Sequence, residues 1–245
     1  MELLDLYEQL KTNAYPGRGI ALGLAPSGKK ALIAYFIMGR SANSRNRVFD
    51  PVEAIGGIRT LAADPAKLED PSLIIYNPVR TVGENTHIVT NGDQTDTVYD
   101  FMAKGDSFEA ALRTRTFEPD GPNWTPRISG VVELAEGGCS YKLSILKSAD
   151  GNGESCRRYF FEYPQPVAGE GHFLHTYKCD GSPIPSFEGE PERVALPEEA
   201  EELAAKMWES LNEDSKVSLF VRAIDLASGE TEDVIINKYD AVCEE

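Results

Sequence analysis

The stretch that decides the fold is an apolar run, IAYFIMGR at residues 33–40, followed at once by a polar run, SANSRNR at residues 41–47. Continuous apolar residues with β-branched and aromatic side chains predict a buried strand. Three arginines, Arg40, Arg45 and Arg47, lie at and just after the end of this strand. Such a local group of positive charges is unusual in a chain whose formal net charge is -16. Because arginine presents a planar fork of donors, this strand end is a candidate site for phosphate or carboxylate. The alternative is that the arginines only pair with surrounding carboxylates.

The overall composition describes a globular protein with a strong acidic excess. Of its 245 residues 41% are hydrophobic, and Asp+Glu number 40 against 24 Lys+Arg. The chain is long enough to bury a sizeable core. Its negative charge disfavours general attraction to nucleic acid or to an anionic membrane, whereas a small phosphorylated ligand responds mainly to local charge. We therefore expect no nucleic-acid or membrane partner.

The lack of a recognisable targeting signal and the cysteine usage predict a cytoplasmic protein. No apolar run approaches the roughly 20 residues that cross a bilayer. The N-terminal segment carries Glu2, Asp5 and Glu8 where a signal peptide would carry positive charge. The four cysteines are scattered and form no Cys-x-x-Cys pair. We expect reduced thiols in a cytoplasmic protein.

Hydrophobic patterning predicts strands in runs, with the helices in separate groups. Strands are expected at residues 20–25, 30–38, 48–49, 73–82, 86–90, 128–134, 140–146, 158–163, 172–177, 217–226 and 234–236, and helices at residues 1–13, 98–102, 106–112 and 197–211. Asp106 and Glu109 resemble a capping box for the third of these helices. This order indicates an α+β fold with two sheets flanked by helices. We expect a single domain over residues 1–245.

Polar side chains recur at the ends of several predicted strands. The positions are Tyr76, Asn77 and Arg80; Asn91, Gly92, Asp93, Thr95 and Asp96; and Glu118, Asp120, Thr125 and Arg127. The second group precedes a predicted helix, whose first backbone amides are free to bind an anion. Each group alone is also typical of turns and helix caps. Their recurrence at strand ends favours a polar pocket for an anionic ligand.

Several familiar signatures are absent from the sequence. There is no G-x-x-x-x-G-K-[ST] loop and no G-x-G-x-x-G motif opening a helix. His172 and His175 are separated by an odd number of positions on a predicted strand and should face opposite ways. We expect these two histidines and His87 to be structural or at the surface, with no metal site.

Taken together, the motifs resemble the archaeal-type inosine monophosphate (IMP) cyclohydrolases, and more closely the bacterial branch of that family. The resemblance rests on residues 35–47, on Tyr76 and Asn77 with Arg80, and on residues 90–97 and 125–128, in the same order. It covers about residues 15–190, the expected core. We expect residues 194–245 to form a C-terminal extension made of a helix and a hairpin.

The resemblance implies both a fold and a reaction. The fold is a four-layer αββα sandwich like that of the N-terminal-nucleophile hydrolases. The reaction closes 5-formamidoimidazole-4-carboxamide ribotide to IMP with loss of water, without a metal or redox cofactor. The implied partner is therefore a purine ribonucleotide, and a homo-oligomer is a further expectation. Amide hydrolysis is disfavoured, because Met1 and Glu2 supply no Thr, Ser or Cys nucleophile.

The resemblance also implies roles for the polar residues. Arg40 would orient the substrate or stabilise the formyl oxygen, and Tyr76 would donate a hydrogen bond or a proton. A carboxylate from Glu118 or Asp120 would steer the carboxamide. The candidates for the phosphate, the ribose and the rest of the substrate are Arg45, Arg47, Asn77, Arg80, Asn91, Gly92, Asp93, Thr95, Asp96, Thr125 and Arg127. Two alternatives stay open: a relative that acts on another nucleotide or amide, and a nucleotide-binding protein without catalysis.

Overall fold

The computed structural model describes residues 3–149 and 151–240. Its α-helices are α1 (Leu6–Thr12), α2 (Ala42–Arg45), α3 (Gln94–Met102), α4 (Phe108–Arg113) and α5 (Ala200–Ser210). Its strands are β1 (Arg18–Leu24), β2 (Lys30–Met38), β3 (Val48–Val52), β4 (Gly57–Leu61), β5 (Val79–Val82), β6 (Thr86–Thr90), β7 (Arg127–Ala135), β8 (Gly138–Ser148), β9 (Cys156–Tyr163), β10 (Glu170–His175), β11 (Glu192–Ala195), β12 (Lys216–Asp225) and β13 (Thr231–Asn237).

The strands form two sheets. One has six strands in the order β11-β10-β1-β2-β12-β13, and the other has seven in the order β3-β4-β5-β6-β7-β8-β9. Each pairing between neighbouring strands is antiparallel. The predicted α+β class is therefore confirmed.

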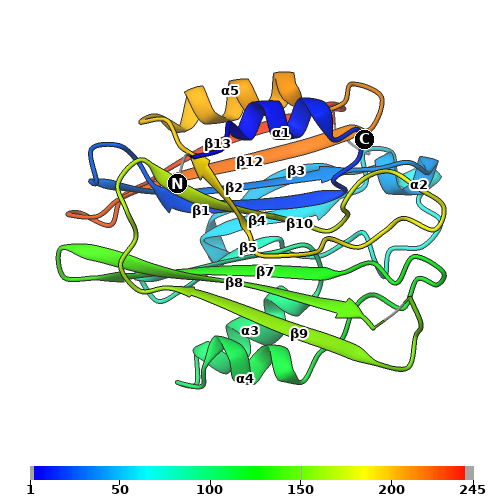
Figure 1. The fold of residues 1–245 in the computed structure, drawn as a ribbon, viewed down its shortest axis with the longest axis horizontal. Helices are drawn as coiled ribbons and strands as arrows, with labels where there is room; N and C mark the ends of the chain where they lie inside the picture. Colours follow the sequence, from blue (N-terminus) through cyan, green and yellow to red (C-terminus); the bar gives the residue numbers. More distant parts are fainter. Residues whose placement is uncertain (1–2, 150, 241–245) are drawn as a thin grey trace.

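The sheets lie face to face, with helices on both outer surfaces (Figure 1). Helices α1 and α5 cover the six-stranded sheet, and α3 and α4 cover the seven-stranded sheet. Three apolar clusters fill the spaces: one beneath α1 and α5, one between the sheets, and one beneath α3 and α4. The layer order is helix, sheet, sheet, helix.

Strand β2 shows why the sequence specifies this layering. Its side chains alternate, so Ile33, Tyr35 and Ile37 lie in the cluster between the sheets. Phe36 and Met38 lie in the cluster beneath α1 and α5. Both faces are covered, which explains the continuous apolar run. Burying one such large side chain contributes about 1.5–3 kcal/mol.

Two strand predictions need correction. The expected strand at residues 73–82 is strand only at β5, because Ile74 and Ile75 donate their backbone N–H groups to the Pro71 carbonyl in a turn. Pro78 then has no N–H to offer a ladder. Strand β4, which begins at Gly57 and pairs with β3, was not among the predicted strands.

The helix boundaries also differ from the predictions. Helix α3 begins at Gln94, four positions before the expected residue 98. Helix α4 is capped by Ser107, whose side chain accepts from the Ala110 N–H, so the capping box at Asp106 is wrong. Helix α1 begins at Leu6 after the Asp5 cap, and residues 1–2 of the expected helix lie outside the described part.

The C-terminal segment is part of the sandwich. The predicted helix and hairpin are present as α5, β12 and β13. However, β12 lies between β2 and β13 and pairs with β2 from one end to the other. The segment that we expected to be an extension of a core at residues 15–190 therefore supplies an interior strand of the six-stranded sheet.

The described cysteines and two of the histidines can be compared with the sequence predictions. Cys139, Cys156 and Cys179 are free thiols, and the fourth cysteine lies outside the described residues. His172 stacks on Tyr163 of the seven-stranded sheet, whereas His175 stacks on Phe173. The two rings thus face opposite ways, as predicted. Within residues 3–149 and 151–240, no helix combines the length and the hydropathy that a membrane crossing needs.

Candidate functional site

A buried group of polar side chains lies where β1, β2, β7 and β10 approach one another. We call it the Arg18 cluster; it consists of Arg18, Tyr35, Arg47, Tyr76, Glu118, Thr125 and Tyr177, each at most 8% exposed. At its centre, Arg18 Nη2 lies 3.9 Å from Glu118 Oε2. That distance allows attraction but exceeds a hydrogen bond. The central ion pair is therefore incompletely bonded.

Three buried atoms of this cluster have no hydrogen-bond partner among the described residues. They are Arg18 Nε, Arg47 Nη1 and Glu118 Oε1. A buried polar group left without a partner costs about 1–3 kcal/mol, and more when it is charged. Native proteins keep few such groups, and each calls for an explanation such as a ligand or ordered water. Two donors and one acceptor are thus available to a polar ligand.

The tyrosines of the cluster are held by hydroxyl contacts. Tyr35 and Tyr76 lie with their hydroxyl oxygens 2.7 Å apart. Thr125 Oγ1 donates to the Asp120 carboxylate and lies 2.5 Å from the Tyr177 hydroxyl. Since the one proton of Thr125 is used on Asp120, Tyr177 must donate to Thr125. Asp120 therefore orients the Thr125 hydroxyl, which in turn accepts from Tyr177.

Burial shifts the ionisation of the cluster. Burial raises the pKa of the Glu118 carboxyl, while the positive charges of Arg18 and Arg127 act in the opposite direction. Burial lowers the pKa of the Arg47 guanidinium, with the charge on Arg18 adding to the effect. The pKa of Tyr35 is raised well above its usual value, mainly by burial. A carboxyl with a raised pKa can both accept and return a proton near neutral pH.

A second group of arginines lies beside the cluster. The Asp93 carboxylate is 2.6 Å from Arg127 Nη1 and 2.5 Å from Arg115 Nη2. Partial burial pushes the pKa of Asp93 upward, but these two cations outweigh it and lower the pKa. A Cβ on Gly92 would lie 2.6 Å from Arg127 Nη1. Because Gly92 has no side chain, the Arg127 guanidinium can lie against it and contact Asp93.

Asn91 and Thr95, both predicted to bind substrate, bond to the protein itself. Asn91 Oδ1 accepts from the Ile128 N–H, and Asn91 Nδ2 donates to the Pro126 carbonyl. The Thr95 hydroxyl bonds to Thr90 and to the Gly92 carbonyl. These contacts tie the end of β6 to β7. The loop thereby positions Arg127, the predicted site residue at the start of β7.

Asn77, Arg80 and Asp96 lie on the other face of the seven-stranded sheet. Arg80 Nη1 is 2.6 Å from Asp96 Oδ1, and its guanidinium carbon lies 3.5 Å from the centre of the Tyr99 ring in α3. Val79, the preceding residue of β5, faces the space between the sheets. Arg80 therefore points to α3, and the structure does not bring these three residues to the Arg18 cluster.

Arg40, which is exposed, and Arg45, which is half-buried, lie outside the buried cluster. Arg40 Nη1 is 2.7 Å from Asp180 Oδ1, and its guanidinium carbon lies 5.3 Å from the centre of the Tyr15 ring. Tyr15 in turn stacks on Tyr177, so Arg40 lies one ring away from the cluster. Arg45 donates to the backbone carbonyls of Asp214 and Arg40. Of the three arginines, only Arg47 is in the cluster.

A family model described as IMP cyclohydrolase-like protein matches residues 15–230. The chain belongs to this family. The match confirms the predicted IMP cyclohydrolase-like family and continues past residue 190 through α5 and β12. Sequence comparison and strand pairing therefore agree that the C-terminal segment is part of the family's common chain.

Sequence reasoning missed several residues of the candidate site. Arg18, Tyr35, Tyr177 and Arg115 were not singled out. Arg18 opens β1, a strand in which all seven residues are buried. A lone arginine at the head of such an apolar strand is a usable signal, since buried charges are rare without a specific partner.

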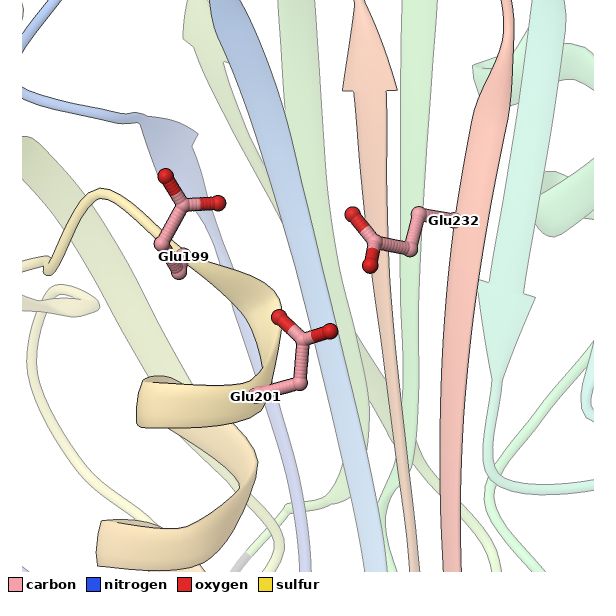
Figure 2. A group of neighbouring side chains, drawn as sticks. All are labelled: Glu199, Glu201 and Glu232. Carbon is pink, nitrogen blue, oxygen red and sulfur yellow. The ribbon is translucent and has the colours of Figure 1, made fainter.

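A separate acidic group lies on the helix side of the six-stranded sheet. Figure 2 shows Glu199 and Glu201 at the start of α5 and Glu232 on β13. One carboxylate oxygen from each residue lies within 4.8 Å of the other two. All three are exposed, and Lys30 Nζ lies 2.5 Å from Glu199. The hydrogen bond and negative charge of Glu201 raise the pKa of Glu232. These contacts describe a solvated surface group outside the candidate site.

Proposed function

We propose that this protein is an IMP cyclohydrolase, which closes 5-formamidoimidazole-4-carboxamide ribotide to IMP and water. The family supports this proposal. The observation that carries it is the set of three unpartnered buried atoms, Arg18 Nε, Arg47 Nη1 and Glu118 Oε1. Two cationic donors and one carboxylate oxygen are the groups that this cyclisation requires.

The reaction forms one carbon–nitrogen bond and expels one water. The carboxamide nitrogen attacks the formyl carbon, and its proton passes to the formyl oxygen to give a cyclic carbinolamine. The hydroxyl group then leaves with the proton of the former formamido nitrogen as water, and a C=N double bond forms within the closed ring. Since both reacting groups are attached to one imidazole, positioning supplies much of the rate.

The charged groups of the cluster match these two steps. Arg18 and Arg47 would stabilise the negative charge that gathers on the formyl oxygen, a contribution of several kcal/mol in a dry site. Glu118 would accept the carboxamide proton and return a proton to the leaving oxygen, which its raised pKa favours. Tyr76, bonded to Tyr35, would orient the formyl group.

The outer arginines suit the ribose phosphate. Arg127 and Arg115 share the Asp93 carboxylate, so each keeps N–H donors for an anion. Arg40, which we predicted as the first catalytic choice, is 40% exposed in its side chain and would close the rim of the pocket through Asp180. We extend the proposal to the fold: the four layers have the order of the N-terminal-nucleophile hydrolase sandwich.

The test is ultraviolet detection of IMP formed from the formylated ribotide by the purified full chain. We expect product with the wild type, a large loss of kcat/KM in Arg18→Gln and Glu118→Gln, and wild-type turnover in Arg59→Gln. Arg59 is a fair control because it forms an exposed ion pair with Asp50. Folded wild-type protein that yields no product would refute the activity. Binding of IMP without turnover would instead favour a non-catalytic nucleotide-binding protein.

A further inference from the structure

A second polar site lies in a cavity outside the Arg18 cluster. The cavity has a volume of about 500 Å³ and lies between the end of α1, strand β10 and the segment that leads into β11. Its walls include Phe173, His175 and Phe187, and its rim carries Asp180, Glu188 and Glu192. None of its lining residues belongs to the Arg18 cluster.

His175 is fixed in orientation and tautomer. Its ring stacks on Phe173 and meets Phe187 edge-on, with ring centres 4.9 and 4.6 Å apart. Its Nδ1 lies 2.8 Å from the backbone carbonyl oxygen of Tyr177. A carbonyl can only accept, so Nδ1 carries the proton of the neutral ring. Nε2 is then left with its lone pair.

Glu192 supplies a carboxylate beside that lone pair. Its Oε1 lies 3.8 Å from His175 Nε2, and its Oε2 is buried without a partner among the described residues. The other two acids of the rim are occupied, since Asp180 pairs with Arg40 and Glu188 pairs with Lys178. The cavity therefore presents the lone pair of an imidazole nitrogen beside a carboxylate whose second oxygen has no partner among the described residues.

We propose that His175 and Glu192 bind a divalent transition-metal ion, such as zinc or cobalt, in this cavity. Ligand bonds from imidazole nitrogen and carboxylate oxygen are about 2.1 Å long. Two such bonds span up to about 4.2 Å, so one ion fits between atoms that are 3.8 Å apart. Water completes the coordination. The carbonyl that holds Nδ1–H is the outer contact that metal-binding histidines commonly have.

The sequence did not suggest this site because its two ligands come from different strands. His175 ends β10 and Glu192 begins β11, with the proline-rich segment between them. The opposite orientation of His172 and His175 excludes that pair as joint ligands. It does not bear on a carboxylate supplied by the neighbouring strand.

The experiment is a titration of the metal-free full chain with Co²⁺, followed by visible absorption and by calorimetry. We expect one ion per chain, with affinity at least tenfold lower in both His175→Gln and Glu192→Gln. Glu188→Gln is the matched control, because Glu188 lines the same cavity but already pairs with Lys178, and its affinity should stay within twofold. Absence of Co²⁺ binding by the wild type, or unchanged affinity in His175→Gln, would overturn the proposal.

A measurement on the wild type guards against misfolded variants. Paramagnetic Co²⁺ should broaden the imidazole NMR signals of His175 at low occupancy and leave those of His87 unchanged. Equal broadening of the histidine signals, or none, would contradict the assignment. Since the readout is metal binding and uses no nucleotide, its result is independent of the cyclohydrolase proposal.

Discussion

Two arginine–carboxylate pairs lie between the sheets, and they differ in how completely they are bonded. Arg222 of β12 meets Asp233 of β13 through two parallel contacts of 2.7 Å, and its third nitrogen donates to the Gly56 carbonyl. Arg18 and Glu118 are 3.9 Å apart, and both keep an unpartnered buried atom. A closed pair needs nothing further from its surroundings. An open pair keeps its donors and acceptor for a ligand, at a cost in stability.

The largest effect should come from neutralising the open pair. Glu118→Gln removes the proton carrier, so we expect kcat/KM to fall by about 10³-fold. The variant should be as stable as the wild type or more stable, because an incompletely bonded buried charge is removed. Steady-state kinetics and thermal unfolding of the same preparation measure both quantities. A clear loss of stability would show that the Arg18–Glu118 pair stabilises the fold, as the Arg222–Asp233 pair is expected to do.

The closed pair should respond in the opposite way. Arg222→Met leaves Asp233 without its cation, and we expect about 4 kcal/mol to be lost from the free energy of unfolding. Activity per folded molecule should stay near the wild-type value, since none of the Arg18 cluster contacts Arg222. Urea unfolding and turnover at a temperature where the variant is folded provide the two numbers. Normal stability in this variant would refute the structural role of the closed pair.

The pH dependence of stability should report on the histidine beside the closed pair. Burial, with the charge of Arg222 adding, lowers the pKa of His87 from 6.5 to about 4. Below pH 6.5 the unfolded chain takes up a proton that the folded chain refuses, so stability should fall as pH drops from about 6.5 to about 4. The shift corresponds to about 3 kcal/mol.

His87→Gln is the variant that isolates this effect, because glutamine still offers Arg222 an acceptor but does not titrate. The difference in unfolding free energy between wild type and variant should change across that pH window and be flat on either side. An identical pH profile for the two proteins would mean that His87 has the same pKa in the folded and the unfolded chain.

A smaller effect is expected beside the open pair. In Gly92→Ala the new methyl group would meet Arg127 Nη1 at 2.6 Å and Gln94 Oε1 at 2.7 Å. Arg127 must then move from Asp93, which should raise KM more than it lowers kcat and cost about 1–2 kcal/mol of stability. Kinetics over a range of nucleotide concentrations separate the two parameters. An unchanged KM would remove Arg127 from the phosphate role.

The smallest effect should come from an exposed pair that serves as a reference. Arg59 Nε lies 2.8 Å from Asp50 Oδ2 across β3 and β4, but both side chains are at least one third exposed. Removing the pair with Asp50→Asn should change stability by less than about 1 kcal/mol. Chemical denaturation decides this, and a larger loss would show that ion pairs in this protein cannot be ranked by burial.

Local patterns in the sequence predicted most of the layers and part of the site. The continuous apolar run of β2 and the acidic residues in the first turn of α5 are local signals, and both elements were found. Strand β4, which lies between β3 and β5, was not predicted, because glycines weaken its pattern and pairing with β3 stabilises it. The break before β5 was also missed, since the turn at Pro71 depends on contacts of its carbonyl.

For the candidate site, the sequence named some of the residues that the structure brings together. Arg47, Tyr76, Glu118 and Thr125 were named and are buried together. Arg80 was also named. The sheet face on which its side chain lies depends on the alternation along β5, and the predicted boundaries of that strand were wrong. Arg18 came into view only when pairing placed the start of β1 beside β2 and β10.

The central position of β12 bears on how the chain is made. Strand β2 can pair with β1 once the first forty residues are made. Its other edge pairs with β12, which is formed only by residues 216–225. During synthesis that edge would stay open while nearly the whole chain emerges, and open apolar edges invite pairing with other chains. Early chaperone binding should therefore centre on β2. A fragment that ends before residue 216 should aggregate through the same apolar run from which the fold is built.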